Sequence, residues 1–143
     1  MPERPDSMDR DDVVGAKAAA QYFIEMYPYV YATGDLEEWV AMAHEDCQFC
    51  ANVVANVTAI HADGGYGVGG DIVVEDVRAM EPGAETEYFR VGLQVTEAPS
   101  VVYTEIGSVQ SSTSGGGGYY LTALSRESGR WVVRAVSAET ASP

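Results

Sequence analysis

The chain has 143 residues, about the length of one domain, which is enough for one sizeable core and too short for two. Its 22 Asp and Glu against 8 Lys and Arg give a formal net charge of −14, which repels phosphate backbones and anionic lipid headgroups. The composition therefore argues against nucleic acid and against a membrane surface as direct partners. No apolar run is long enough to span a bilayer, so we expect no membrane insertion by the chain as given.

The first part of the chain predicts an arm and a long helix. Residues 1–10 carry two prolines and several charges and offer little to bury, so they are expected to form a flexible arm before a single domain over residues 11–140. A helix is predicted from Val13 to Tyr27, capped by one of the two preceding aspartates. Its polar residues recur every four positions in one narrow stripe, which indicates a largely enclosed helix. Pro28 predicts a kink or an end at the preceding residue before the helix resumes.

Two shorter helices are expected next. A Thr-Gly-Asp turn at residues 33–35 ends the first helix, and Asp35 with Glu38 three positions later has the pattern of a capping box that opens a second helix. A third helix is predicted from Phe49 to Ala62, with a glycine pair directly after it.

After Gly65 the hydrophobic period changes to two, which predicts strands. The expected strands are Ile72–Met80, Thr86–Thr96, Val101–Gln110, Tyr119–Ser125 and Trp131–Ala138. Turn compositions between them indicate an antiparallel meander, and the low-complexity tract Ser111–Gly118 is expected to form the tip of a longer hairpin. Helices followed by strands predict an α+β domain, with N-terminal helices packed on a curved antiparallel sheet.

A series of short motifs carries a family resemblance. They are Tyr31–Asp35, Cys47–Cys50, the glycine pairs at 64–65 and 69–70, and Arg130–Val133. In these motifs the chain resembles the actinobacterial lipoprotein-type domain of unknown function 6318, from about Asp11 to Ser137. The order of elements resembles the nuclear-transport-factor-2-like (SnoaL-like) cone fold. The resemblance implies export behind a signal and a lipobox cysteine, both absent from the sequence given, and display at the cell envelope on the extracellular side of the plasma membrane. It implies no activity, because the family is uncharacterised.

The two cysteines have three possible interpretations: a structural disulfide, a redox motif or half of a metal site. A thioredoxin-type motif follows a strand in a βαβ unit, whereas the residues before Cys47 are predicted to be helical. A metal site would need His44 and His61 as well, but His61 lies about three helical turns from Cys50, roughly 16 Å at 1.5 Å per residue. We therefore expect a disulfide between Cys47 and Cys50 and no metal.

The resemblance also implies a pocket between the sheet and the long helix. Four tyrosines are the candidate ligand-binding residues: Tyr22, Tyr29, Tyr103 and Tyr120. No catalytic residue is assigned, because no carboxylate is predicted within an otherwise apolar helix or strand face.

Three functions follow as hypotheses. The first is an envelope-displayed, non-enzymatic domain that binds a partner protein or a small apolar ligand, with no cofactor. The second is an isomerase or dehydratase-type enzyme that uses the same tyrosine-lined cavity. The third is a scaffold that forms a homodimer through the exposed face of its sheet.

Overall fold

The computed structural model describes residues 1–83 and 87–140. Its helices are a 3₁₀ helix η1 (Asp6–Asp9), α1 (Val13–Thr33), α2 (Glu37–Met42) and α3 (Gln48–Ala62). Its strands are β1 (Tyr66–Gly69), β2 (Ile72–Met80), β3 (Phe89–Glu97), β4 (Ser100–Tyr103), β5 (Val109–Thr113), β6 (Gly116–Glu127) and β7 (Arg130–Thr140). Thr86, the predicted start of the third strand, lies outside the described residues.

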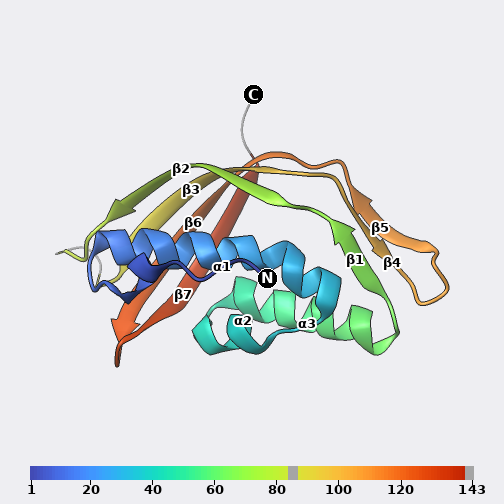
Figure 1. The fold of residues 1–143 in the computed structure, drawn as a ribbon, viewed down its shortest axis with the longest axis horizontal. Coiled ribbons are helices and arrows are strands. Elements are labelled where there is room, and N and C mark those ends of the chain that lie inside the picture. The colour runs from blue at the N-terminus through green and yellow to red at the C-terminus, as the bar shows by residue number, and fades with distance from the viewer. Residues whose placement is uncertain (84–86, 141–143) are drawn as a thin grey trace.

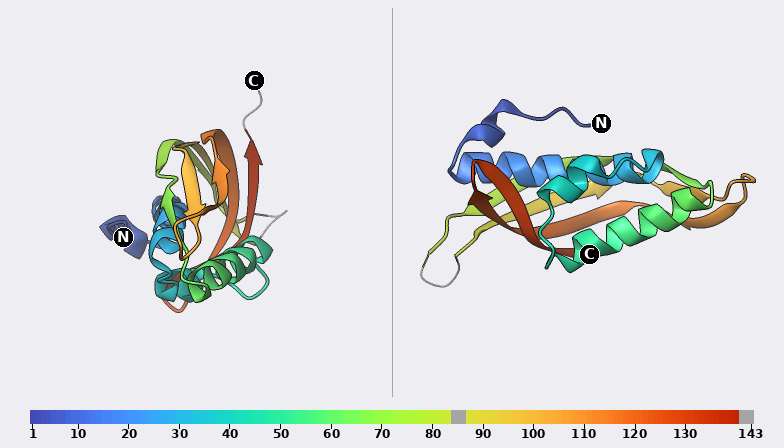
Figure 2. Two further views of the ribbon diagram at one scale, coloured as in Figure 1. Left: turned by 90° about the vertical axis from the view of Figure 1, so that its right-hand side faces the viewer. Right: turned by 90° about the horizontal axis from the view of Figure 1, so that it is seen from below.

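The helices cover the concave side of a strongly bent surface that two antiparallel sheets form together (Figure 1). Seen from below, α1 and α3 both lie across this side, and the strands run behind them (Figure 2). The predicted α+β class is confirmed. The core lies between α1 and the inner face of the sheet, where Phe23, Ile24 and Leu93 are fully buried.

The first helix reaches the Thr-Gly-Asp turn at which its sequence predicts an end, without a break at Pro28. The Asp12 carboxylate accepts hydrogen bonds from the backbone N–H groups of Val14 and Gly15, which are unpaired at a helix start. The helix continues through Pro28 to Thr33 and ends at Gly34, whose φ of 76° is the left-handed conformation that glycine adopts without strain. Of the two outcomes expected before Pro28, a kink or an end, the end does not occur, because packing along the helix outweighs the one hydrogen bond that proline removes.

The next two helices begin close to their predicted positions. The Asp35 carboxylate accepts a hydrogen bond of 3.2 Å from the Glu37 backbone N–H, one position earlier than a capping box would place it. The α3 helix begins at Gln48, and the Cys47 sulfur accepts a hydrogen bond from the Cys50 backbone N–H.

The strands form two hydrogen-bonded sheets, in the orders β2-β3-β6-β7 and β1-β4-β5. The chain passes between the two sheets at three bends, from β1 to β2, from β3 to β4 and from β5 to β6. These three bends lie next to one another. Gly70 N–H donates to the Pro99 carbonyl at 3.0 Å, and Ala98 N–H donates to the Asp71 carbonyl at 2.9 Å. A Cβ on Gly115 would lie 2.4 Å from the Glu97 carbonyl oxygen, so only glycine fits the third bend.

The hairpin of β4 and β5, here called the second hairpin, differs from its prediction. Val101–Gln110 is not one strand, because β4 ends at Tyr103 and β5 begins at Val109. The tip between them is closed by a hydrogen bond of 2.8 Å from Thr104 N–H to the Ser108 carbonyl. The tract predicted as the tip, Ser111–Gly118, instead supplies the end of β5, a bend and the start of β6.

The N-terminal segment packs against the domain, although its sequence indicates little to bury. The Met8 side chain is 3% exposed, and its carbonyl accepts a hydrogen bond of 2.8 Å from Trp131 Nε1. The Arg126 guanidinium donates to the carbonyls of Met8 and Asp9 and pairs with the Asp11 carboxylate at 2.6 Å. These contacts join residues 6–11 to the end of the sheet formed by β6 and β7.

Candidate ligand-binding site

A carboxylate lies on the inner face of the sheet at the end of β3. Val91, Leu93 and Val95 alternate along this strand and are at most 2% exposed. The same alternation continues to Glu97, which is half-buried. The prediction concerns carboxylates within an apolar face, whereas Glu97 occupies the end of one. The signal is present in the sequence, one step beyond the last apolar residue of the predicted strand.

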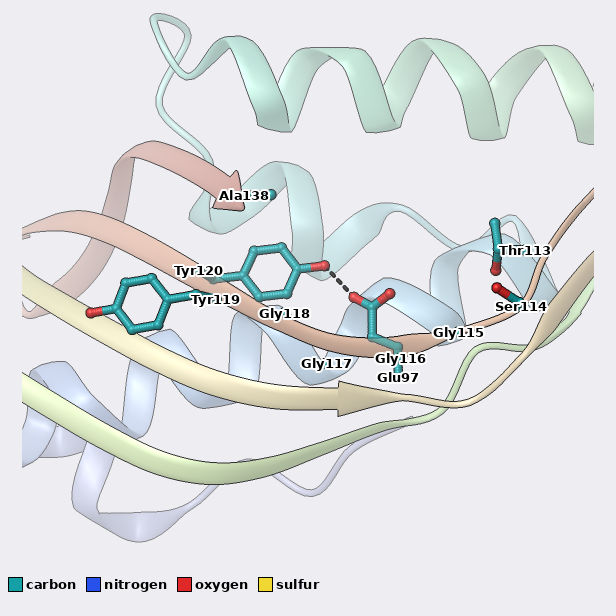
Figure 3. Close-up of a pocket in the computed structure, with 10 residues that line it drawn as sticks. All are labelled: Glu97, Thr113, Ser114, Gly115, Gly116, Gly117, Gly118, Tyr119, Tyr120 and Ala138. Carbon is teal, nitrogen blue, oxygen red and sulfur yellow. Dashed lines mark hydrogen bonds between the residues drawn. The ribbon is translucent and has the colours of Figure 1, made fainter. Parts of the chain in front are cut away.

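Two cavities meet at Glu97. The first, here called the glycine cavity, has a volume of about 290 Å³ and is lined by Glu97, Thr113–Gly118, Tyr119, Tyr120 and Ala138. In Figure 3 the Tyr120 ring points toward Glu97, whereas Tyr119 points the opposite way. The second, the tyrosine cavity, has a volume of about 240 Å³ between the C-terminal half of α1 and the smaller sheet. It is lined by Tyr27, Pro28, Tyr31, Gly67–Gly70, Glu97, Ser100–Val102 and Ser111–Thr113.

The Glu97 carboxylate is held from one side. The Tyr120 hydroxyl donates a short hydrogen bond to its Oε1 atom (Figure 3). Within the described residues, its Oε2 atom has no hydrogen-bond partner in the protein. One carboxylate oxygen is thus positioned, and the other is available to a ligand as an acceptor.

Aromatic rings form a continuous wall behind the two cavities. The Tyr27 and Tyr31 ring centroids lie 5.0 Å apart, and Phe49 lies 6.1 Å from both Tyr27 and Tyr120. Trp39 lies behind this wall, fully buried and stacked on Phe23 at 3.9 Å. Such ring pairs pack favourably in tilted and edge-to-face arrangements, so the wall is a packed aromatic surface.

Two tyrosines of this wall have pKa values well above the usual range of tyrosine. Burial raises the pKa of Tyr120 strongly, and its hydrogen bond to Glu97 adds to the effect. Burial also raises the pKa of Tyr27, with a further contribution from neighbouring Tyr31. Both hydroxyls therefore act as hydrogen-bond donors, not as charged groups, in the physiological range.

The structure does not bring the four candidate tyrosines together. Tyr120 lines the glycine cavity, but Tyr22 is buried on α1 against the N-terminal segment, in a separate cavity with Glu3 and Lys17. The Tyr29 hydroxyl donates to the Asp35 carboxylate at 2.7 Å. Tyr103 packs on Tyr66 at 5.5 Å, near the tip of the second hairpin. A role for these three in ligand binding remains a prediction.

The cysteine pair supports the aromatic wall from behind. Cys47 and Cys50 form a disulfide, and both are buried. The Cys50 carbonyl accepts a hydrogen bond of 3.2 Å from Trp39 Nε1. The disulfide-bonded Cys50 is therefore hydrogen-bonded to Trp39, whose ring packs behind Tyr27 and Phe49.

Neither histidine lines the two cavities. His61 contacts the Tyr31 carbonyl through Nε2 at 2.8 Å, and His44 Nδ1 accepts a hydrogen bond from the Asp46 backbone N–H. In the part of the chain that the structure describes, no three metal-ligating side chains converge. None of the helices in that part has the length and apolar character that a membrane crossing needs.

Comparison with solved structures defines the class. The chain is similar to the intermembrane space region of the chloroplast protein ARC6, with a TM-score of 0.64 and 9% identity over 92% of this chain and 99% of that one. It is similar to Aln2 from a Streptomyces species, with a TM-score of 0.54 and 14% identity over 92% and 93%. An uncharacterised Caulobacter vibrioides protein with a cystatin-like fold gives a TM-score of 0.54 and 13% identity over 87% and 89%. The domain therefore has the cystatin-like, nuclear-transport-factor-2-like fold.

The family follows from the sequence as a whole. Residues 1–137 match the model of the Family of unknown function (DUF6318), and the chain belongs to that family. No curated protein matches the chain.

Proposed function

We propose that the chain is a binding domain that takes up a small ligand with an apolar body in the two cavities at Glu97. The observation that carries the proposal is the half-buried Glu97 carboxylate, with one oxygen held by Tyr120 and the other available beside an aromatic wall. Ligand sites are typically apolar concavities with a few polar groups that fix orientation. The tyrosine cavity has this character, because valines, glycines and two tyrosine rings surround one carboxylate. The glycine cavity adds hydroxyl groups and glycine backbone on the other side of Glu97.

A neutral fluorescent probe tests this proposal. N-phenyl-1-naphthylamine is largely apolar, carries one N–H donor and becomes bright in apolar surroundings. We expect saturable fluorescence enhancement with the wild-type protein. Ser112→Trp, which fills the tyrosine cavity from β5, should weaken binding at least tenfold, about 1.4 kcal/mol. Ser137→Trp, at an exposed position on β7 outside both cavities, is the matched control. The absence of saturable binding, or equal binding by both variants, would overturn the proposal.

An enzyme of the isomerase or dehydratase type is the second candidate, and Glu97 is the observation that favours it. Its available oxygen is a candidate general base, and the hydroxyls of Tyr27 and Tyr31 are candidate donors to a carbonyl oxygen. A panel of small enolisable ketones in heavy water tests this function by proton NMR. Exchange next to the carbonyl should be faster with the wild-type protein than with Glu97→Gln. Equal rates would remove this candidate.

The same proposal places the domain outside the cytoplasm, anchored by lipid at the envelope of an actinobacterium in the full-length protein. The Cys47–Cys50 disulfide supports it, since such bonds persist in oxidising compartments. Cell fractionation and the upstream reading frame test it. We expect the protein in the envelope fraction and an export signal with a lipobox cysteine upstream. A cytoplasmic fraction with reduced cysteines would contradict it.

A homodimer through the outer face of the sheet is a further proposal. Val73, Tyr119 and Leu121 lie exposed on this face, and their cross-strand partners are Thr96, Gln94 and Gly92 of β3. Sedimentation over a range of concentrations tests it. We expect a dimer for the wild-type protein and a monomer for Leu121→Asp. A wild-type monomer at all concentrations would exclude this interface.

A further inference from the structure

The Glu97 carboxylate has no counter-charge within the described residues. The ion pairs found there all involve other carboxylates. Neither cavity is lined by Lys, Arg or His. A partly buried carboxylate without a cationic partner loses hydration that the protein does not replace. One hydrogen bond from a neutral tyrosine compensates for only part of this loss.

The surroundings of Glu97 suit a cation of a particular kind. Tyr27 and Tyr31 line the tyrosine cavity, and Tyr120 lines the glycine cavity. The negative faces of aromatic rings attract ammonium ions, and the attraction is greatest where the ion is desolvated. Metal ions such as Mg²⁺ and Ca²⁺ need several oxygen ligands, which one carboxylate does not supply. Rings and one carboxylate together fit an organic ammonium group better than a metal.

The net charge of the whole chain also favours a cationic ligand. A formal net charge of −14 raises the local concentration of cations and lowers that of anions. We propose that the ligand of this site is a small organic ammonium ion, whose charge is neutralised by Glu97 and whose alkyl groups pack on Tyr27 and Tyr31. This inference rests on the proposed small-ligand function and names the chemical class of its ligand.

A matched pair of compounds tests the charge. Choline and 3,3-dimethylbutan-1-ol have nearly the same shape, but choline has a quaternary nitrogen where the alcohol has carbon. Binding of each is followed by nitrogen-15 NMR of the protein and by displacement of N-phenyl-1-naphthylamine. We expect the wild-type protein to bind choline at least tenfold more tightly. Higher ionic strength should reduce this preference by screening the charge.

Two variants assign the preference to Glu97. Glu97→Gln removes the charge but keeps an acceptor for the Tyr120 hydroxyl, so the preference for choline should disappear while the probe still binds. Glu45→Gln removes the same charge from an exposed turn outside both cavities and should keep the preference. The amide spectrum of each variant reports directly on whether it is folded.

The outcomes separate the two proposals. Equal binding of both compounds, or binding of neither while the probe still binds, overturns the ammonium ligand and leaves the small-ligand function standing. A preference that persists in folded Glu97→Gln also overturns it. If choline, its isostere and the probe all fail to bind the wild-type protein, both proposals are wrong.

Discussion

The Tyr120 hydroxyl reaches from β6 to the end of β3 and donates its hydrogen bond to Glu97 (Figure 3). The two residues are 23 positions apart in the sequence, and the antiparallel pairing of their strands brings them together. Because the raised pKa of Tyr120 keeps its proton on the hydroxyl, the arrangement leaves the carboxylate as an acceptor at the meeting point of two cavities.

Removing the Tyr120 hydroxyl should destabilise the fold. Tyr120→Phe deletes a hydrogen bond to a charged group and leaves Glu97 without its protein partner, at a cost of about 1–2 kcal/mol. Urea unfolding measures the change. Tyr119→Phe is the control, since the ring of this neighbour points away from Glu97 and is 40% exposed. Equal losses for the two variants would mean that the hydrogen bond to Glu97 adds nothing to stability.

Alkaline pH should destabilise the protein through its neutral tyrosines. The pKa values of Tyr27 and Tyr120 are raised in the folded state, mainly by burial, whereas in the unfolded chain they return to about 10. Their contribution is therefore fully present below pH of about 10 and is lost as the pH rises toward the folded-state values. Urea midpoints measured from about pH 8 to 11 should fall at the upper end.

A double variant tests whether Tyr27 and Tyr120 cause the loss of stability at alkaline pH. Tyr27→Phe combined with Tyr120→Phe should make the fall of the urea midpoint shallower. Tyr66→Phe changes an exposed tyrosine and should keep the wild-type slope. A double variant with an unchanged slope would show that other groups cause the loss.

The cysteine pair should contribute measurable stability. The unreduced protein should give no reaction with Ellman's reagent, and two thiols should appear after reduction in denaturant. Replacing both cysteines by alanine should cost about 2 kcal/mol, because the short closed loop removes little entropy from the unfolded chain. Reductant should lower the melting temperature of the wild-type protein but not that of the variant. Two free thiols in unreduced protein would contradict the disulfide.

The N-terminal segment should matter for stability. Met8→Ala removes a buried side chain and should cost about 2 kcal/mol, the lower end for a core methionine. Met80→Ala is the control, because Met80 is 58% exposed and should change the free energy of unfolding by less than about 0.5 kcal/mol. If Met8→Ala behaved like the control, the packing of this segment would be irrelevant to the stability of the domain.

Helices and strands whose apolar residues recur at a regular spacing can be predicted from the sequence. The alternation at Val91, Leu93 and Val95 is a property of neighbouring residues, and the structure confirms their common buried face. The predicted limits of the third helix and of the strand Ile72–Met80 are also close to the observed ones. The disulfide follows from weighing alternatives for two cysteines, and the structure contains it.

The predictions fail where contacts between residues far apart in the sequence determine the local structure. Glycine and serine at residues 111–118 have the composition of a loop, but cross-strand partners turn most of them into strand. The bend at Gly115 requires glycine because the Glu97 carbonyl oxygen passes close by. The candidate tyrosines are chosen by residue type, and type does not say which side of a helix or strand faces a cavity. The aromatic wall joins Tyr27 of α1 to Phe49 of α3, and the local sequence of neither helix indicates this contact.

The adjacent bends at Gly70, Pro99 and Gly115 have an evolutionary consequence. Hydrogen bonds and close contacts connect them laterally, so a residue inserted or deleted at one bend would put that strand out of step with its neighbours. Related chains should therefore vary in length at all three positions together or at none of them, and the angle between the two sheets should be inherited as a unit.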